Sequence, residues 1–301
     1  DLPVVLGHEL AGHVEAVGSE VTRVAEGDRV VVALAHHCGH CHHCESGHPM
    51  LCDQREEQRP RLSVDGYAVH QGFGTGGFAE RVIVRGVSAI PVPDDVPMDV
   101  AAVMGCATAT GLGAVFNIAK VEPGARVAVI GAGGIGQHVI MACRIAGASQ
   151  IVVAEPNHAR AAVALELGAT DHSASSGEAL REFRPEGFDH VFESVGRVDL
   201  MGEAVRLARK GGTATLIGVS EPGATVPLDA LDLVVGQKRV LGCLTGNLRP
   251  NIDFDLFFRL YRSGALPVDR MISDHLGFAD IGRAFEQTRR GTGLRTVVTI
   301  E

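Results

Sequence analysis

The stretch that decides the fold runs from residue 126 to residue 136 and reads Arg-Val-Ala-Val-Ile-Gly-Ala-Gly-Gly-Ile-Gly. Residues 126–130 form a short apolar run typical of a buried strand, and a helical segment follows the glycines. In such a turn the first glycine bends the chain, the second lets a diphosphate approach the backbone, and the last lets helix and strand pack closely. The pattern predicts a dinucleotide-binding turn made by Gly131, Gly133, Gly134, Ile135 and Gly136.

A carboxylate in the next predicted strand indicates which dinucleotide binds. Glu155 ends the apolar run 151–155, 19 positions after Gly136. There it can accept hydrogen bonds from the adenosine ribose hydroxyls and repel a 2'-phosphate, which favours NAD over NADP. Arg160, about one helical turn beyond, could support either cofactor through the ribose. The alternative is a glycine-rich turn in an α/β domain with an incidental surface glutamate.

The pattern around this turn predicts two kinds of domain. From residue 126 to residue 219 strands and helices alternate, which predicts a parallel sheet with helices on both faces and the α/β class. Residues 4–93 instead contain short apolar runs between glycines and charges, with strands expected over 12–17 and 78–84. Residues 53–65 read as an exposed loop. The 301 residues, 46% of them hydrophobic, suffice for two cores.

Four cysteines lie close together in the sequence, with the spacing C-x2-C-x2-C-x7-C. Four thiolates can surround one ion in a closed tetrahedron, which predicts a structural zinc site at Cys38, Cys41, Cys44 and Cys52. An iron–sulfur cluster is the competing interpretation, but the bacterial ferredoxin run ends in C-x3-C-P and the last gap here is seven. Histidines at positions 36, 37, 40, 42, 43 and 48 are expected to be surface residues rather than ligands, and Cys143 and Cys243 to be packing residues.

Charge and hydropathy limit the possible partners. The net charge of -9 argues against a nucleic-acid surface and against anionic membranes. We find no secretory leader and no apolar run of the roughly 18 residues that span a bilayer, so a cytoplasmic protein with small-molecule partners is expected. The opening Asp-Leu-Pro is not a natural start, and a preceding segment is expected.

Further motifs occur in a fixed order around the turn and the cysteines. They are Gly7-His8-Glu9, the Gly-Asp-Arg-Val of residues 27–30, the Gly-Phe-Ala-Glu of residues 77–80, Gly105-Cys106, and the Arg-Thr-Val-Val-Thr of residues 295–299. Over essentially the whole chain this order resembles the zinc-containing medium-chain alcohol dehydrogenases. The resemblance implies a Rossmann domain, with a doubly wound parallel sheet, and a mainly β GroES-like catalytic domain. It places the catalytic domain at 1–107 with its zinc lobe near 36–53, the Rossmann domain at 108–246 and the return to the catalytic domain at 247–301.

The same resemblance implies a second zinc site and a set of cofactor contacts. His8 and Cys106 would be ligands of a catalytic zinc, with Glu9 an occasional ligand. A third ligand, a cysteine, and the proton-relay hydroxyl would precede Asp1. Thr110 would lie beside the nicotinamide, Ile217 and its neighbours to 219 and residues 243–245 would line its pocket through backbone, and Arg295 would reach the pyrophosphate.

The expected activity is hydride transfer between an alcohol and NAD, giving an aldehyde or ketone, with zinc in a catalytic and a structural site. Two alternatives remain: a thiol-dependent formaldehyde dehydrogenase, which shares every motif above, and a catalytically silent NAD-binding fragment. The expected partners are a small alcohol or aldehyde and further copies of the chain, as a homodimer or homotetramer.

Overall fold

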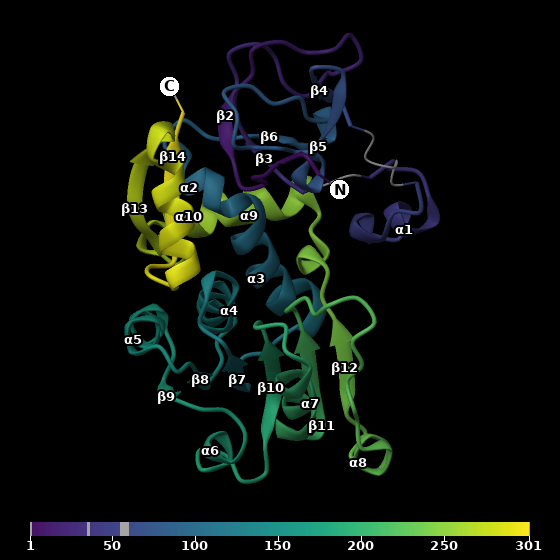
Figure 1. The fold of residues 1–301 in the computed structure, drawn as a ribbon. Helices are drawn as coiled ribbons and strands as arrows, with labels where there is room; N and C mark the ends of the chain where they lie inside the picture. Colours follow the sequence, from purple (N-terminus) through teal and green to yellow (C-terminus); the bar gives the residue numbers. More distant parts are fainter. Residues whose placement is uncertain (1, 35–36, 55–59, 301) are drawn as a thin grey trace. The chain divides into compact units, whose positions relative to one another are not determined.

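The computed structural model describes residues 2–34, 37–54 and 60–300. The chain forms two compact units: a first unit of Asp1–Ala109 with Leu248–Glu301, and an inserted unit of Thr110–Asn247. Sequence analysis places the two divisions after residues 107 and 246. Each unit has its own sheets and its own core (Figure 1).

The first unit contains three small sheets, ordered β1-β5-β4, β2-β3-β6 and β13-β14. Its strands are β1 (Val4–Val5), β2 (Ala11–His13), β3 (Arg29–Val32), β4 (Leu62–Val64), β5 (Tyr67–Gln71), β6 (Ala89–Pro91), β13 (Ile272–Gly277) and β14 (Arg295–Thr299). Its helices are α1 (His42–Glu45), α2 (Met98–Val103), α9 (Pro250–Arg262) and α10 (Ile281–Arg290). Most strands are short, and β1 pairs with β5 across more than sixty residues of chain.

Several strand predictions in this unit are wrong. Residues 78–84 contain no strand, and the strand expected over 12–17 is limited to Ala11–His13. The predicted loop 53–65 contains strand β4, which pairs with β5; residues 55–59 of that loop and His36 lie outside the described residues. The cause is that pairing with distant segments, rather than local alternation, decides strands of this length.

One helix corrects the hydropathy analysis. Met98–Ala119 is a continuous helix of 22 residues, and it contains an 18-residue window with a mean hydropathy of 1.5. By length and composition it could span a bilayer. However, 72% of that window is buried inside the protein, which is typical of a core helix, and the helix continues from one unit into the other.

The inserted unit contains a sheet of six parallel strands in the spatial order β12-β11-β10-β7-β8-β9. Strand order reverses between the neighbouring strands β7 and β10, the place where doubly wound sheets bind ligands. The predicted α/β class is confirmed. Its strands are β7 (Arg126–Ile130), β8 (Gln150–Ala154), β9 (Asp171–Ser173), β10 (Phe188–Glu193), β11 (Ala208–Leu216) and β12 (Arg239–Gly242). Its helices are α3 (Ala109–Gly113), α4 (Gly134–Ile145), α5 (His158–Leu167), α6 (Glu178–Arg181), α7 (Val198–Leu207) and α8 (Ala230–Val235).

Local sequence explains where these helices begin and what they bury. The side chain of Asn157 accepts hydrogen bonds from Ala159 N and Arg160 N and caps α5, which ends at Gly168. Helix α4 buries residues 136–143 without interruption, so this stretch of the helix is covered on all its faces and not only on the face toward the sheet. Phe188, Val191, Val152 and Ile130 belong to one core cluster of the sheet.

A carboxylate at the start of β10 joins three strands of this sheet. Asp189 Oδ2 accepts hydrogen bonds from Arg126 N, at 2.8 Å, and Arg126 Nε, at 2.9 Å, at the start of β7, and Asp189 Oδ1 accepts one from Arg209 Nε on β11. Partial burial acts to raise the pKa of Asp189, but the hydrogen bonds from Arg126 and Arg209 hold that pKa well below its usual range. The folded state therefore favours the charged carboxylate.

We expect Asp189→Asn to lower the free energy of unfolding of the inserted unit at pH 7 by about 2–3 kcal/mol, because charge-assisted hydrogen bonds are lost. Since the folded pKa lies below the unfolded value near 3.9, this stabilisation is complete above about pH 4 and is lost as the pH falls through the folded pKa. Urea unfolding of both proteins between pH 7 and pH 3 should show the difference shrinking. The control is Asp199→Asn, whose ion pair with Arg197 is exposed to solvent and should contribute much less. Equal effects of the two substitutions would contradict this account.

Candidate functional site

The four clustered cysteines come together in the first unit. Their Sγ atoms all lie within 4.8 Å of one another, and among the residues described they form the only group of three or more candidate ligands this compact. Cys44 lies in α1, Cys41 is the N-cap residue of α1 and Cys52 follows the short 3-10 turn Pro49–Leu51, whereas Cys38 lies in the segment before α1. Among residues 37–54, the described part of this lobe, no further helix or strand occurs, so a bound ion would supply much of its order.

The spacing of the thiols fits zinc. Sγ–Sγ distances are 3.9 Å for Cys38 and Cys44, 3.5 Å for Cys41 and Cys44, and 3.9 Å for Cys41 and Cys52. A tetrahedron with Zn–S bonds of about 2.3 Å has edges of about 3.8 Å. Backbone N–H groups of Cys38 and His40 also donate to Sγ atoms within the cluster. Hydrogen bonds from the backbone of Cys44 and Asp53 lower the pKa of Cys41 to about 6, which favours a thiolate.

The glycine turn in the inserted unit has the geometry that close backbone packing requires. A Cβ atom on Gly136 would lie 2.0 Å from Gly131 O, so no side chain fits there. Gly131 has a φ of +91°, in the left-handed region. A Cβ on Gly133, by contrast, would meet nothing within 4 Å, which leaves open space beside the turn at the start of α4. Such space at a helix N-terminus suits a diphosphate.

Glu155 follows β8 and holds this turn. Its Oε2 accepts a hydrogen bond from Ala132 N at 2.8 Å, and its Oε1 accepts one from Asn157 N at 2.9 Å. The residue is only 5% exposed. Arg160 lies in the first turn of α5, where its backbone carbonyl accepts a hydrogen bond from Gln137 Nε2 at 2.8 Å. The predicted ribose carboxylate therefore lies against the glycine turn.

The other predicted cofactor residues of the inserted unit lie in three places. Thr110 is buried in α3, and Ile217 is buried just after β11, with its N–H donating to Glu193 O at 2.8 Å. Val219, two residues on, is almost fully exposed. Cys243 follows β12, where its N–H donates to Leu216 O. Residues 217 and 243 are thus adjacent through the backbone at the carboxyl ends of neighbouring strands.

Glu9 lies against both neighbours of Cys106 in the first unit. Ala107 N donates to Glu9 Oε1 at 2.8 Å, and a Cβ on Gly105 would lie 3.9 Å from Glu9 Cα. The neighbours of Cys106 on both sides therefore contact the residue next to His8. Cys106 lies in a π-helical segment, Met104–Thr108, and such segments are frequent at functional sites. An imidazole and a thiol are both suitable zinc donors.

Arg295 forms an ion pair with the same carboxylate of Glu9. Its Nε is 3.2 Å from Glu9 Oε2, and both side chains are about three-quarters buried. The carboxylate of Glu9 is thus held by a backbone N–H and by a guanidinium. The structure places Arg295 in the first unit, and its predicted reach to the pyrophosphate stays a prediction.

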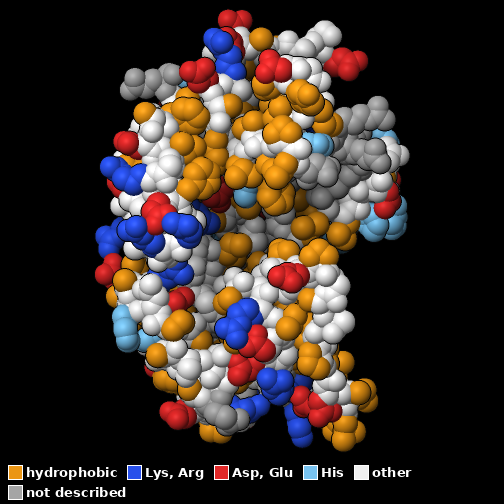
Figure 2. Space-filling view, in the orientation of Figure 1, with side chains coloured by type: hydrophobic (Ala, Val, Ile, Leu, Met, Phe, Trp, Pro, Cys, Tyr) orange, Lys and Arg blue, Asp and Glu red, His pale blue; other side chains and the backbone are white. Residues whose placement is uncertain are grey.

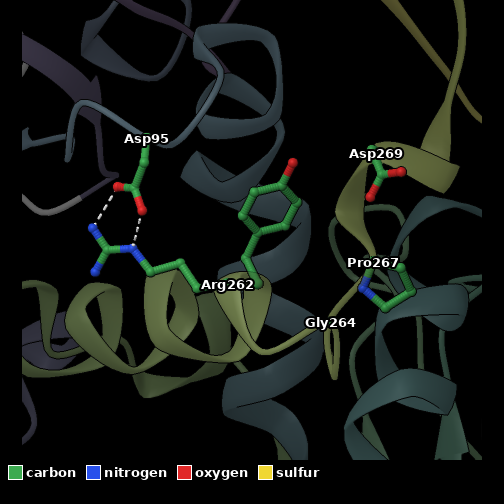
Figure 3. A pocket seen from close by; sticks show the side chains of 6 residues that line it. Asp95, Arg262, Gly264, Pro267 and Asp269 are labelled. Carbon is green, nitrogen blue, oxygen red and sulfur yellow. Dashed lines mark hydrogen bonds and ion pairs between the residues drawn. The ribbon is translucent and has the colours of Figure 1, made fainter.

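A surface pocket of about 480 Å³ in the first unit contains none of these residues. It is lined by Asp95, Tyr261, Arg262, Gly264, Pro267 and Asp269. Figure 3 shows Arg262, from α9, in a two-pronged ion pair with Asp95, while Asp269 lies at the other side of the pocket. Asp95 and Arg262 neutralise each other, and the residues that line the pocket do not form a cluster of metal ligands.

Comparisons with known proteins match both parts of the chain. Residues 1–94 match the family described as "Alcohol dehydrogenase GroES-like domain", and residues 134–260 match the family described as "Zinc-binding dehydrogenase". A geraniol dehydrogenase of Castellaniella defragrans is 34% identical over 313 residues, covering 99% of this chain and 83% of that protein.

The chain belongs to the zinc-dependent medium-chain dehydrogenase family.

Solved structures agree with this assignment. The crystal structure of benzyl alcohol dehydrogenase from Acinetobacter calcoaceticus is 30% identical, with a TM-score of 0.92, over 100% of this chain and 85% of that one. A putative zinc-binding dehydrogenase of Sinorhizobium meliloti, solved bound to NADP, is 28% identical, with a TM-score of 0.79, over 100% of this chain and 84% of that one. The predicted fold, enzyme class and cofactor types are confirmed: this medium-chain dehydrogenase is a zinc-dependent alcohol oxidoreductase that uses a nicotinamide cofactor.

Sequence reasoning misses two features of this medium-chain dehydrogenase. Glu193 ends β10 fully buried, and its Oε1 accepts hydrogen bonds from Val195 N and Gly196 N, which shapes the loop packed on Gly131. Phe73 lies against His8. The sequence signal for Glu193 is a charged residue at the end of an apolar strand, and the signal for Phe73 is a bulky residue within a run of glycines.

We expect Cys38→Ser to remove one zinc ion per chain and to lower the thermal midpoint of the first unit, because a closed four-thiolate site contributes its binding energy to folding. Metal content by mass spectrometry and a melting curve check this. The matched control is His42→Ala, an exposed residue of the same lobe, which should keep both values. Zinc loss in the histidine variant, or iron with acid-labile sulfide in the unmodified protein, would refute the assignment.

Proposed function

We propose that His8 and Cys106 bind the catalytic zinc of this dehydrogenase, and that the enzyme transfers hydride between a primary or secondary alcohol and NAD. The observation that carries the proposal is the hydrogen bond from Ala107 N to Glu9 Oε1 at 2.8 Å. It joins residues 98 positions apart and brings the neighbours of a histidine and a cysteine together.

The residues of this site have separable roles. When bound, zinc would supply the Lewis acidity that lowers the pKa of an alcohol hydroxyl, and NAD would supply the hydride acceptor. His8 and Cys106 supply one neutral and one anionic donor. Glu9, held by Ala107 N and Arg295, orients the His8 segment and adds a negative charge that the guanidinium balances. A fixed carboxylate behind a metal ligand is a common way to orient such sites.

The chain's preference for NAD rests on Glu155. The family includes a protein solved with NADP, so the fold alone leaves this choice open. In this chain Glu155 follows β8 beside the glycine turn, and the residue is only 5% exposed. A 2'-phosphate there would meet a poorly solvated negative charge. Repulsion between two poorly solvated negative charges disfavours NADP. We therefore propose NAD as the cofactor.

The relatives' names suggest a substrate class. Geraniol and benzyl alcohol are both primary alcohols whose carbinol carbon is bonded to an unsaturated carbon. Two relatives of 34% and 30% identity, each covering nearly all of this chain, are named for such alcohols. We propose that this dehydrogenase also oxidises alcohols of this type.

We further propose that a second copy covers one face of the inserted unit. Helix α8 directs Leu233 toward the core, but Leu231, Val234 and Val235 are 73%, 73% and 62% exposed. Figure 2 shows hydrophobic side chains at the lower right, where Figure 1 places α8. Strand β12 is the adjacent edge of the sheet, and unpaired edges favour strand pairing between copies. A monomer at micromolar concentration in analytical ultracentrifugation would overturn the homo-oligomer.

We expect Cys106→Ser to lower kcat for benzyl alcohol at least about a thousandfold, since the Lewis acid contributes several kcal/mol to the transition state. It should also remove one zinc while the four-cysteine lobe keeps its own. NADH affinity, measured by fluorescence titration, should change less than about threefold because the glycine turn is untouched. The control Cys143→Ala, at a core position of α4, should keep zinc and turnover. Full turnover by the serine variant would refute the ligand assignment.

We expect Glu155→Ala to raise the Michaelis constant for NAD about tenfold and to narrow the gap to NADP, because a charge-assisted hydrogen bond of about 1.5–3 kcal/mol is lost. Steady-state kinetics with both cofactors check this. A melting curve shows whether loss of the hydrogen bond from Ala132 N destabilises the fold, and so separates this effect from weaker cofactor binding. Tighter binding of NADP than NAD by the unmodified protein would show that the assignment is wrong.

A further inference from the structure

Phe73 adopts a backbone conformation that bulky residues avoid. Its φ is 52° and its ψ is 29°, in the left-handed region, within the run Gly-Phe-Gly-Thr-Gly-Gly of residues 72–77. An aromatic residue there is an outlier, since glycine or asparagine fits at lower cost. Strain of this kind persists only where the surroundings fix it, and it is frequent at ligand sites.

The surroundings do fix this turn. Before it, β5 pairs with β1, and a Cβ on Gly72 would lie 3.2 Å from Val5 O. After it, Gly77 N donates to Gly7 O at 2.7 Å. Across it, Arg61 donates to Gly74 O at 2.7 Å. The turn is therefore attached on both sides to the segment that ends in His8.

The attached turn presents the Phe73 ring to His8. The two ring centroids are 4.6 Å apart and the planes are tilted by 53°. Phe73 is nevertheless 62% exposed, so most of its apolar surface is not used for packing within the protein. A single exposed aromatic residue is normal on a protein surface. What distinguishes Phe73 is that a strained, doubly anchored backbone holds it beside the proposed zinc ligand.

We propose that the Phe73 ring is a flat wall of the substrate site that selects alcohols whose carbinol carbon carries an aromatic or other planar unsaturated group. The inference rests on the proposed function, because it takes His8 as a zinc ligand. A planar π group bonded to the carbinol carbon can stack on or against the edge of a phenyl ring. A saturated ring of equal carbon number is thicker and has no quadrupole, so it gains only the burial of its surface.

The kinetic test compares benzyl alcohol with cyclohexylmethanol on the zinc-loaded enzyme. In Phe73→Leu, which keeps an apolar side chain and removes the π face, the ratio of kcat/KM for the two alcohols should fall about threefold to tenfold. Phe73→Tyr should restore the ratio. Phe73→Asn, which tolerates the left-handed backbone, should lose the preference while the protein remains folded. This variant keeps the test valid if the leucine variant misfolds.

A binding test uses the absence of tryptophan from the sequence. Phe73→Trp introduces a single tryptophan, whose emission can be excited selectively. Benzyl alcohol, added to the zinc-loaded protein without NAD so that no turnover occurs, should shift this emission to the blue in a saturable manner. Cyclohexylmethanol should produce half-saturation only at several-fold higher concentration. The control is Phe278→Trp, an exposed phenylalanine of the same unit on the turn before α10, which should give no saturable shift.

The outcomes separate this inference from the proposed function. Oxidation of neither alcohol by the unmodified enzyme overturns the proposed function. Oxidation of both alcohols with an unchanged ratio in Phe73→Leu and Phe73→Asn overturns the role of Phe73 and leaves the proposed function standing. Equal saturable shifts in the two tryptophan variants likewise overturn the role of Phe73.

Discussion

The rest of the inserted unit depends on the close approach of Gly136 to the carbonyl oxygen of Gly131. A Cβ at position 136 would lie 2.0 Å from that oxygen, so helix α4 can leave strand β7 only where the side chain is absent. The same turn donates a hydrogen bond from Ala132 N to the carboxylate of Glu155, which follows β8, and packs against Val195 after β10. Three adjacent strands therefore end at one turn, and the open space beside Gly133 lies where their loops meet.

How far the fold could be predicted differs between the two units. In the inserted unit β7 and β8 are short, mostly apolar runs, and α5 begins at a capping asparagine and ends at a glycine, so local signals suffice for these elements. Strand β9, Asp-His-Ser, contains no apolar residue and is defined by its pairing with β8. In the first unit, strands of two to six residues depend on partners far along the chain. Residues 78–84 contain the apolar runs 78–79 and 82–84, which favour a strand, yet only Phe78, through its N–H to Leu6 O, makes a ladder-like bond to the first segment. Local apolar runs could not reveal that a pairing partner is missing.

The candidate site divides in the same way. The zinc lobe could be predicted because its four thiols lie within fifteen residues, so spacing alone limits their geometry. His8 and Cys106 are joined only by the family resemblance, since neither motif indicates the other. The ion pair of Glu9 with Arg295 and the contact of Phe73 with His8 could not be predicted, because both depend on tertiary packing between distant segments. The glycines around Phe73 mark the turn without indicating what the ring contacts.

The four lobe cysteines and the proposed catalytic ligands His8 and Cys106 also differ in when they can first meet during synthesis on the ribosome. Cys38 and Cys52 are 14 positions apart, whereas Glu9 and Ala107 are 98 positions apart. Closing the longer loop costs roughly 1.7 kcal/mol more chain entropy. The lobe can capture its ion as soon as residue 52 has emerged, before any part of the nucleotide-binding sheet exists. The proposed pair of His8 and Cys106, by contrast, can form only after residue 106 has followed, about a third of the way along the chain.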